Sequence, residues 1–450
     1  MKQYIVAILL TLLTSPGCKK YLDEKPDQSL VVPNTLKGLQ ALLDNNGSLN
    51  KNNPSWGMAS SDDYFLTADV YNSRSVQQKL AYIWGLKDYS TFPNEWAKIY
   101  NQVYIANVVL EGIGSIPKDI SNKNDWENIH ASALVYRAQS FFRAVLLFSK
   151  AYNEQTAHND LGIVLRLTSD YNERSARASI FDSYAKIVND LKEAAIFLPN
   201  IPITVLRPSK PAAYGLLART YLAMAEYDSA WKYSDLSLQI NNQLLDYNDL
   251  DVNASFPFQP FNKEVIFHST VGSYIFSNVS PNNARIDTTL FGLYDNNDLR
   301  KLLFFRLRAV PNIYSFKGNY NGNTDLFVGI ANDELFLTRA ECYARKGNKD
   351  AAIADLNFLL LKRWKAGTFN PLSAGSANEA LSIILSERRK ELIFRDLRWM
   401  DIKRLNREGA NIVLKRIVLG QEYTLLPNEN RYALQLPADI ISMTGMPQNP

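Results

Sequence analysis

Residues that could carry out catalysis are few in this sequence and form no recognisable pattern. The three histidines, His130, His158 and His268, lie far apart, whereas a two-histidine metal site on one helix needs a spacing of three or four residues. The sequence has no G-x-S-x-G nucleophile motif, Walker loop or Rossmann fingerprint. Adjacent acids such as Asp62 and Asp63 are common, and a glycosidase needs two carboxylates across a cleft. We therefore predict a protein that is not an enzyme and uses no metal or cofactor.

Aromatic side chains with polar neighbours are a different kind of candidate site. Trp and Tyr offer flat apolar faces that stack on sugar rings or peptide side chains, while nearby Asn and Asp bond the polar groups. Tyr64 in "SDDYF" and Trp84 in "YIWG" precede the first strong helix. Tyr314, Asn319 and Tyr320 lie among turn-forming Gly and Asn residues. We take these five as candidate ligand-binding residues; the alternative is a place in the core, where most large aromatic side chains lie.

The two cysteines indicate an anchor rather than a disulfide framework. Cys342 lies in a helical pattern and is expected to be a small core residue. Cys18 follows an apolar run, residues 4–13, that is typical of a signal peptide and shorter than the roughly 20 residues that span a bilayer. Its context resembles the lipobox of bacterial lipoproteins, although Ser15 stands where that pattern has Leu. We predict removal of residues 1–17 and lipidation of Cys18; the alternative is an ordinary secretory signal.

Composition indicates a folded protein without an electrostatic footprint for nucleic acid. Hydrophobic residues make up 46% of the 450 residues and charged residues 21%, which is ordinary for a globular chain. The net charge of +4 is spread over the sequence without a long run of one sign. The length exceeds that of a usual single domain, so we expect two domains or one large composite body.

Helices are predicted by apolar positions that recur every three or four residues. This spacing occurs over residues 96–110 and again over 134–148. A third helix is predicted to begin after Ser179, with Asp182 three residues later as a capping signal, and to end at Pro199. These helices are expected to bury one apolar face each.

Two later segments share their Ala, Tyr and Asp positions: "ARTYLAMAEYDSA" at 218–230 and "AECYARKGNKDAA" at 340–352. Each predicts two helices joined by a short turn, which is typical of tetratricopeptide repeats. The alternative is two unrelated helical hairpins, at 211–240 and 333–364. The stretch 241–332 between them is rich in Asn, Gly, Pro, Phe and Tyr, and predicts an irregular subdomain with short strands such as "EVIFHSTVG".

The segment "EALSIILSERRKELIFRDLRWMDIKRL" predicts one last long helix. Its charges alternate in sign and allow pairs between Glu391 and Arg395 at a spacing of four. Arg388 with Glu391, and Asp401 with Arg404, are spaced by three. We interpret the segment as a helix on a solvated or interdomain face rather than as a basic patch.

In chain order, a set of segments resembles the RagB/SusD family: Cys18 with "YLDEKP", "WAKIYNQVYIANVVLEGI", "YRAQSFFRAVLLF", "KPAAYGLLARTYLAMAEYDSA", "NKEVIF", "DELFLTRAECYARKGN", "ERRKELIFRDLRWMDIKRL" and "LPADIISMTGMPQNP". Members of this family are outer-membrane lipoproteins of Bacteroidetes-type bacteria with four tetratricopeptide-like helix pairs. They bind a nutrient, commonly a glycan, cap a SusC-like TonB-dependent transporter and have no catalytic activity. The resemblance implies repeat pairs at 92–150, 180–240 and 333–364, and it places Tyr64 and Trp84 in a region that often contributes to ligand binding.

The predicted fold class is mainly α, with tetratricopeptide-like helix pairs beside an irregular, loop-rich subdomain that contains short strands. The predicted divisions are a signal peptide at 1–17, a tether and loop-rich segment at 18–90, a helical repeat body at 91–240, a ligand-binding insert at 241–332 and a C-terminal helical region at 333–450.

The resemblance implies a lipid-anchored outer-membrane protein, exposed at the cell surface, that binds an oligosaccharide and delivers it to a SusC-like transporter. Its expected partners are this transporter, the glycan and the membrane, with no nucleic acid. One alternative is a peptide-binding member of the same family. Others are a repeat scaffold that binds only proteins and a glycosidase with unrecognised carboxylates.

Overall fold

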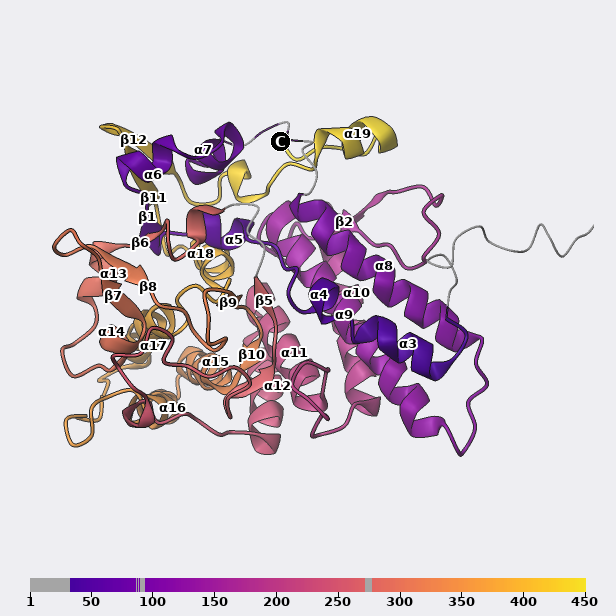
Figure 1. Cartoon of the computed structure of the whole chain (residues 1–450), viewed down its shortest axis with the longest axis horizontal. Coiled ribbons are helices and arrows are strands. Elements are labelled where there is room, and N and C mark those ends of the chain that lie inside the picture. The colour runs from indigo at the N-terminus through magenta and orange to yellow at the C-terminus, as the bar shows by residue number, and fades with distance from the viewer. Residues whose placement is uncertain (1–32, 86, 88, 90–93, 272–276) are drawn as a thin grey trace, which may run out of the picture.

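The computed structural model describes residues 33–85, 87, 89, 94–271 and 277–450 (Figure 1). The predicted signal peptide and Cys18 lie outside these described residues. Figure 1 shows long helices on one side of the molecule and a part with short helices and strands on the other. The mainly α architecture predicted from the sequence is confirmed.

Long helices form where the apolar periodicity predicts them. They are α8 (Glu95–Gly114), α9 (Lys123–Phe148) and α10 (Ile180–Phe197). The Oδ1 atom of Asn94 accepts a hydrogen bond from the amide of Ala97 at 2.8 Å and thereby caps α8. The predicted cap of α10 is confirmed, because Ser179 Oγ accepts from the amide of Asp182 at 3.0 Å. Each cap satisfies one backbone donor that the first helical turn leaves unpaired.

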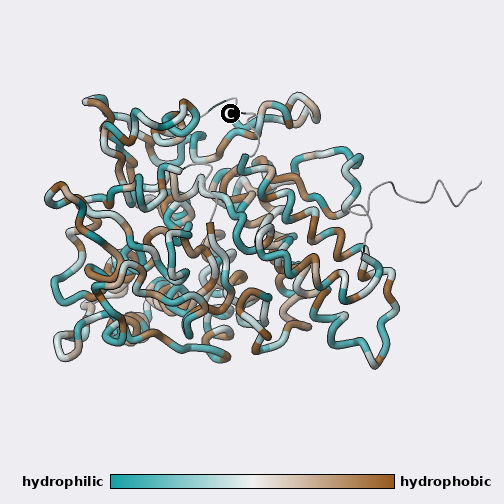
Figure 2. Tube along the Cα trace, viewed as in Figure 1, coloured by the Kyte–Doolittle hydropathy of each residue, from teal (hydrophilic) through white to brown (hydrophobic). Residues whose placement is uncertain are grey.

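Both predicted helical hairpins are present. They consist of α11 (Lys210–Met224) with α12 (Tyr227–Ile240), and α15 (Asn332–Arg345) with α16 (Lys349–Leu360). Each helix from α8 to α12 packs against the next, and α12 packs directly against α15. The repeat stack therefore continues directly from α12 to α15, although residues 241–331 separate these two helices in the sequence. Figure 2 shows hydrophobic and hydrophilic residues interleaved along these helices, as expected for helices with one buried face.

Strands are short and occur in antiparallel pairs. The pairs are β1 (Tyr64–Phe65) with β6 (Arg285–Ile286), β2 (Leu161–Val164) with β3 (Arg177–Ser179), β4 (Val265–Phe267) with β10 (Ile330–Ala331), β5 (Thr270–Val271) with β9 (Leu326–Phe327), β7 (Phe305–Leu307) with β8 (Tyr314–Phe316), and β11 (Leu414–Val418) with β12 (Gln421–Leu425). The prediction of strands in "EVIFHSTVG" is confirmed by β4 and β5. The irregular part packs tightly on the repeats, because a Cβ added to Gly215 of α11 would lie 2.5 Å from Ile330 of β10.

Short helices complete the chain. They are α3 (Leu36–Leu43), α4 (Asn46–Leu49), α5 (Trp56–Ser60), α6 (Ala68–Asn72), α7 (Val76–Tyr82), α13 (Thr288–Gly292), α14 (Arg300–Leu303) and α19 (Ala438–Thr444). Residues from the repeats, the segment before α8 and the stretch 241–332 all contribute to one large hydrophobic cluster. None of the described helices is long and apolar enough to span a membrane.

The predicted long C-terminal helix is wrong, because the structure divides it in two. Six residues separate helix α17 (Ala377–Glu391) from helix α18 (Arg398–Arg407). Between them Phe394 has φ 52° and Asp396 has φ 59°, both in the left-handed region that few non-glycine residues adopt. Phe394 is buried and Asp396 is partly buried in the surrounding structure, so tertiary contacts override the helical periodicity here.

Of the two faces predicted for this segment, solvated or interdomain, the solvated face is wrong. Arg388, Lys390, Glu391, Arg395 and Arg404 are each at most 4% exposed. Their partners come from elements that are distant in the sequence, and a local charge pattern cannot reveal them. The buried charges are paired, as the cost of removing ions from water requires.

One buried ion network has Glu391 at its centre. Its two carboxylate oxygens accept from Arg300 at 2.9 Å and from Arg363 at 2.7 Å. Arg300 also bonds Asp298 at 2.7 Å, and Arg363 also bonds Glu264 at 2.9 Å. The network joins α17 to the end of α16 and to two loops of the stretch 241–332.

A second buried network contains one of the predicted pairs. Asp401 accepts from Arg404 at 2.8 Å, as predicted, and from Arg388 at 2.9 Å. The predicted pair of Glu391 with Arg395 is replaced, since Arg395 bonds Asp333 of α15 at 2.9 Å. Arg404 also forms a bidentate pair with the buried Glu341 of α15.

Glu341 predicts a pH dependence of stability. Burial alone would raise its pKa, but the Arg404 guanidinium at 2.6 Å outweighs burial and lowers the pKa to about 2. Because the folded pKa lies below the unfolded value, this stabilisation is present above about pH 4.5 and is lost as pH falls towards 2. We expect Glu341→Gln to lower the free energy of unfolding by about 3 kcal/mol at pH 7.

Denaturant unfolding of the wild type and the variant at pH 7, 5 and 3 measures this effect. The difference between them should shrink at pH 3, whereas the exposed control Glu154→Gln should match the wild type throughout. A difference that is absent at pH 7, or constant across the series, contradicts the assignment.

Candidate functional site

An open cleft of about 590 Å³ lies between α8, the loop that joins β2 to β3, and α19. Figure 1 shows these three elements on the same side of the molecule. Its wall includes Trp96, Tyr100, Tyr104, Arg166, Asp170, Tyr171, Glu173 and Arg174. Its volume lies in the range of about 300–1,000 Å³ that is typical of small-molecule sites. We call it the aromatic cleft.

One wall of the aromatic cleft is a row of rings on α8. Trp96, Tyr100 and Tyr104 are four residues apart, so they lie on one face of the helix. The rings of Trp96 and Tyr100 stack with their centroids 4.2 Å apart. Trp96 is only 9% exposed, whereas Tyr104 is 47% exposed. The row therefore has a buried base and an open end.

The opposite wall carries a second open ring. Tyr171 in the loop between β2 and β3 is 85% exposed. A single exposed ring is ordinary on a protein surface, and what distinguishes Tyr171 is that it lines the same cleft as Tyr104. Tyr104 and Tyr171 thus present two apolar faces to one cleft.

Hydrogen bonds fasten this loop to α8. Tyr100 Oη donates to the carbonyl of Val164 at 2.9 Å, and burial raises the pKa of this phenol. Asn107 Nδ2 donates to the carbonyls of Arg166 and Thr168, each at 3.0 Å. These bonds hold both walls of the aromatic cleft at a fixed separation.

Glu111, one turn further along α8, extends this fastening. Its Oε1 accepts from the amide of Ser169 at 2.6 Å, and its Oε2 accepts from the hydroxyl of the same residue. The carboxylate is therefore used to position the loop.

Polar groups at the mouth of the aromatic cleft balance in charge. Arg166 bonds Ser175 at 2.9 Å and lies 3.5 Å from Glu173. Arg174 is exposed and makes no ion pair within the described part of the chain. With Asp170, the lining carries two cations and two carboxylates, which offers donors and acceptors without a net charge. This arrangement fits a neutral, hydroxyl-rich ligand better than an ionic one.

Arg416 of this protein packs against the rings of two predicted ligand-binding residues, Tyr64 and Trp84. The guanidinium of this β11 residue lies 4.5 Å from the ring of Tyr64, 4.1 Å from Tyr82 and 5.5 Å from Trp84. It also donates to the carbonyl of Ser61 at 2.6 Å. Tyr64 and Trp84 are 2% and 4% exposed, so neither can stack on a ligand in this structure.

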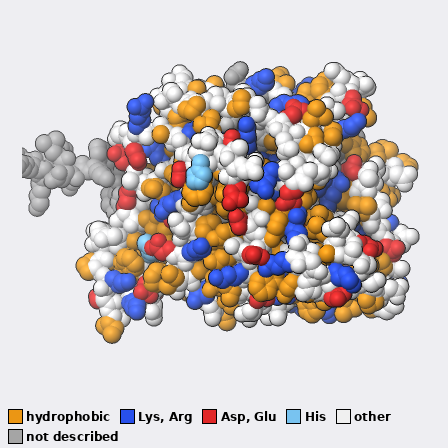
Figure 3. All heavy atoms as spheres, turned by 180° about the vertical axis from the view of Figure 1, so that it is seen from behind, with side chains coloured by type: hydrophobic (Ala, Val, Ile, Leu, Met, Phe, Trp, Pro, Cys, Tyr) orange, Lys and Arg blue, Asp and Glu red, His pale blue; other side chains and the backbone are white. Residues whose placement is uncertain are grey.

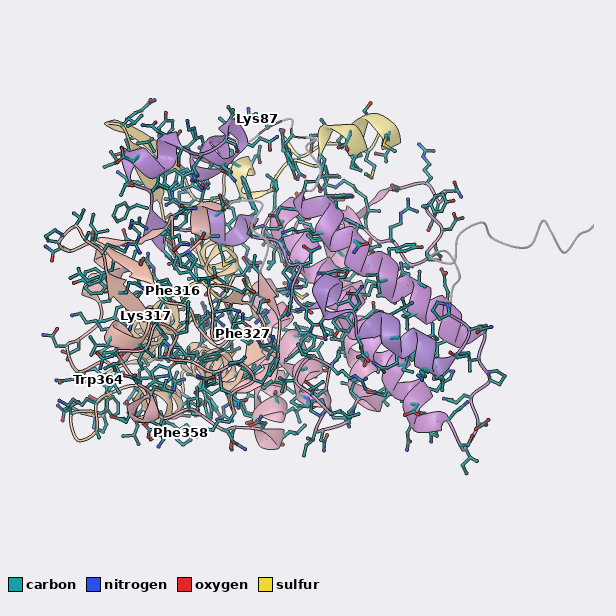
Figure 4. All side chains as sticks on the ribbon, viewed as in Figure 1. Lys87, Phe316, Lys317, Phe327, Phe358 and Trp364 are labelled. Carbon is teal, nitrogen blue, oxygen red and sulfur yellow. The ribbon has the colours of Figure 1, made fainter. Side chains whose placement is uncertain are left out.

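Asn319 and Tyr320 are also buried, at 5% and 1% exposure. Asn319 accepts from the amide of Phe327 at 2.9 Å, and Tyr320 Oη lies 3.2 Å from a carboxylate oxygen of Asp333. Figure 4 labels Phe327, whose ring lies 5.6 Å from that of Tyr320. Their roles are structural in this conformation, because they satisfy buried groups.

Tyr314 is the one predicted residue that is partly exposed. Its ring stacks on Phe291 at 3.7 Å, away from the aromatic cleft. A ligand role for Tyr314 stays a prediction.

Two further side chains with reactive groups, Cys342 and His268, lie in the interior. Cys342 is fully buried, as expected for a core residue. His268 is 2% exposed, and burial lowers its pKa to about 4. Among the described residues, no three His, Cys, Asp or Glu side chains are placed to hold a metal ion.

Comparisons with known proteins identify the family. A model of a SusD-like family described as "Starch-binding associating with outer membrane" matches residues 20–222. A second model, of the SusD family, matches residues 317–435. SusD-like protein P2 of Formosa agariphila is 23% identical over 479 residues, which cover 90% of this chain and 91% of that protein.

Solved structures share the fold. A putative sugar-binding protein of Bacteroides vulgatus superposes with a TM-score of 0.76 at 18% identity, covering 93% of this chain and 99% of its own. A laminarin-binding SusD-like protein superposes with a TM-score of 0.66 at 18% identity, covering 92% and 98%. Since two SusD models match one chain and its relatives cover it almost from end to end, the chain belongs to the SusD/RagB family.

Proposed function

We propose that this protein binds a neutral nutrient glycan in the aromatic cleft and delivers it to a SusC-like TonB-dependent transporter of the outer membrane. The observation that carries the first half is the pair of open rings, Tyr104 and Tyr171, on two walls of one cleft. Sugar rings have apolar faces that stack on such rings and hydroxyls that bond the surrounding polar groups.

The spacing of the rings on α8 suggests how a glycan lies. Residues four apart on a helix rise by about 6 Å, which is close to the length of one sugar unit. A chain that follows α8 from Tyr100 to Tyr104 therefore places successive units over successive rings. Arg174, which forms no ion pair with another described residue, is available to donate to a hydroxyl at the mouth.

The family supports the ligand class. One of the family models is described as starch-binding, and one related structure is of a laminarin-binding protein. Both names refer to glucose polymers, which carry no charge. The balanced charge of the cleft lining agrees with a ligand of this kind.

Delivery and anchoring form the second half of the proposal. Cys18 would become the lipidated first residue, and more than one acyl chain is needed for a stable anchor. The description of the matching family as associated with the outer membrane supports this location. The protein would act without catalysis, as a binding partner of the transporter.

Replacement of the open rings tests the binding half. We expect Tyr104→Ala and Tyr171→Ala each to weaken the binding of laminarin or maltodextrin oligosaccharides by about tenfold, equivalent to about 1.4 kcal/mol. Isothermal titration of the purified protein measures this. The matched control is Phe358→Ala on α16, since Phe358 is 49% exposed and lies outside the cleft (Figure 4).

Unchanged affinity in both tyrosine variants would remove the cleft as the glycan site. Binding to peptides without binding to any glycan would instead favour the peptide-binding alternative.

Loosening the loop tests the role of Glu111. We expect Glu111→Ala to free Ser169 and to raise the hydrogen-exchange rate of the loop 165–176 by about tenfold, because a charge-assisted hydrogen bond contributes about 1.5–3 kcal/mol. Glycan affinity should fall at the same time. Glu127→Ala, which removes a partly buried carboxylate of α9 from its pair with Lys118, should change neither measurement. A loop that exchanges at the wild-type rate in Glu111→Ala contradicts this positioning role.

A further inference from the structure

A second cavity, of about 400 Å³, lies between the loop after α9, the C-terminal turn of α18 and the loop after β12. Its lining includes Lys150, Asn153, Asp160, Lys403, Arg407, Asn428 and Glu429. It shares no lining residue with the aromatic cleft. We call it the basic pocket.

The three cations of the basic pocket lack counter-charges. Within the described chain, neither Lys150 nor Lys403 nor Arg407 forms an ion pair with a carboxylate. Arg300, Arg363 and Arg404, by contrast, each bond at least one carboxylate. The pocket therefore gathers positive charge that the fold does not neutralise.

Both carboxylates of the pocket have other bonds. Glu429 pairs with Arg431 at 2.6 Å and accepts from the amide of Leu426 at 2.7 Å. Asp160 accepts from the hydroxyl of Thr156. Neither carboxylate is within ion-pair distance of the three cations. The cations therefore remain available to a negatively charged ligand.

Lys403 is the deepest of the cations, at 5% exposure. Its ammonium donates to the carbonyls of Leu146 at 2.8 Å and Ser149 at 2.6 Å, at the C-terminus of α9. These dipoles satisfy two of its three protons, but they supply no full negative charge. Burial lowers its pKa to about 7, which shows the cost of an ammonium without a counter-ion.

The rest of the wall is polar and shaped for more than a bare ion. Asn153 and Asn428 contribute amides, and the ring of Tyr432 stacks on Trp399 at 4.9 Å to form a flat side. The volume lies within the range of small-molecule sites. A ligand that carries both an oxyanion and hydroxyl groups would contact the cations with the one and the polar wall with the other.

We propose that the basic pocket binds the oxyanion of a small, hydroxyl-rich solute, an acidic monosaccharide being the size and chemistry that fit, through Lys150, Lys403 and Arg407. The oxyanion is a carboxylate or a sulfate ester, since both accept hydrogen bonds from ammonium and guanidinium groups. This site is separate from the aromatic cleft and does not depend on the glycan proposed for it.

The test is a titration of the whole protein at low salt and pH 6.5 with four probes: glucuronate, glucose 6-sulfate, glucose and inorganic phosphate. We expect glucuronate or glucose 6-sulfate to bind, and glucose and phosphate to bind at least tenfold more weakly. Lys150→Gln and Arg407→Gln should each weaken the acidic sugar by roughly tenfold, as the loss of a charge-assisted hydrogen bond predicts. Lys37→Gln, which removes an exposed lysine of α3, is the charge-matched control.

Two outcomes overturn the proposal. One is that the acidic sugar binds the Lys150 and Arg407 variants as tightly as it binds the wild type, or that it binds neither the wild type nor the variants. The other is phosphate that binds as tightly as the acidic sugars, since the pocket would then recognise only the ion. Because Lys403→Met removes a cap of α9 and can unfold the protein, the test rests on the two more exposed cations. Tyr104→Ala should leave acidic-sugar binding unchanged, which distinguishes this site from the aromatic cleft.

Discussion

The pairing of Glu391 with two arginines is the constraint on which the non-repeat part of this protein depends. Arg300 and Arg363 are fully buried, and each would be costly in the interior without its carboxylates. Loss of one partner from such a buried pair costs about 3–5 kcal/mol, because the other charge is left uncompensated. The stretch 241–332 has strands of only two or three residues, so its position cannot come from a sheet. Hydrophobic contacts with the repeat stack, together with ion pairs to α17 and to Arg363 just after α16, hold it in place instead.

The same principle explains why the obvious aromatic cluster is not an open binding surface. Arg416 reaches from the C-terminal β11 into the rings of Tyr64, Tyr82 and Trp84, and it bonds backbone carbonyls beside them. A cation of the chain thus occupies the place that a ligand would take. Figure 3 shows basic and acidic side chains interspersed on the face that it presents, without a large area of one sign. The open rings of the aromatic cleft are left as the better candidate surface.

Sequence periodicity predicted the repeat body well, because helix formation in α8 to α12 is governed by local spacing and caps. Ser179 and the matched alanines around 218 and 340 are signals of this kind. The break at Phe394 and Asp396 carried no local signal, since left-handed backbone at these residues is imposed by tertiary contacts. Burial of the charged C-terminal segment was missed for the same reason: its partners, such as Asp333 and Glu341, are far away in the chain.

The candidate site was only partly visible in the sequence. Trp96, Tyr100 and Tyr104 recur every four residues, and this aromatic row could have been recognised as a surface on one helix face. Tyr171 gives no such signal, because its position in the cleft depends on a loop that Asn107 and Glu111 of α8 hold through hydrogen bonds.

The most direct test of glycan binding in the aromatic cleft is a crystal structure of the protein with a bound laminarin or maltodextrin oligosaccharide. We expect sugar rings over Tyr104 and Tyr171. Density for the sugar at any other surface, with the aromatic cleft empty, would contradict glycan binding in this cleft.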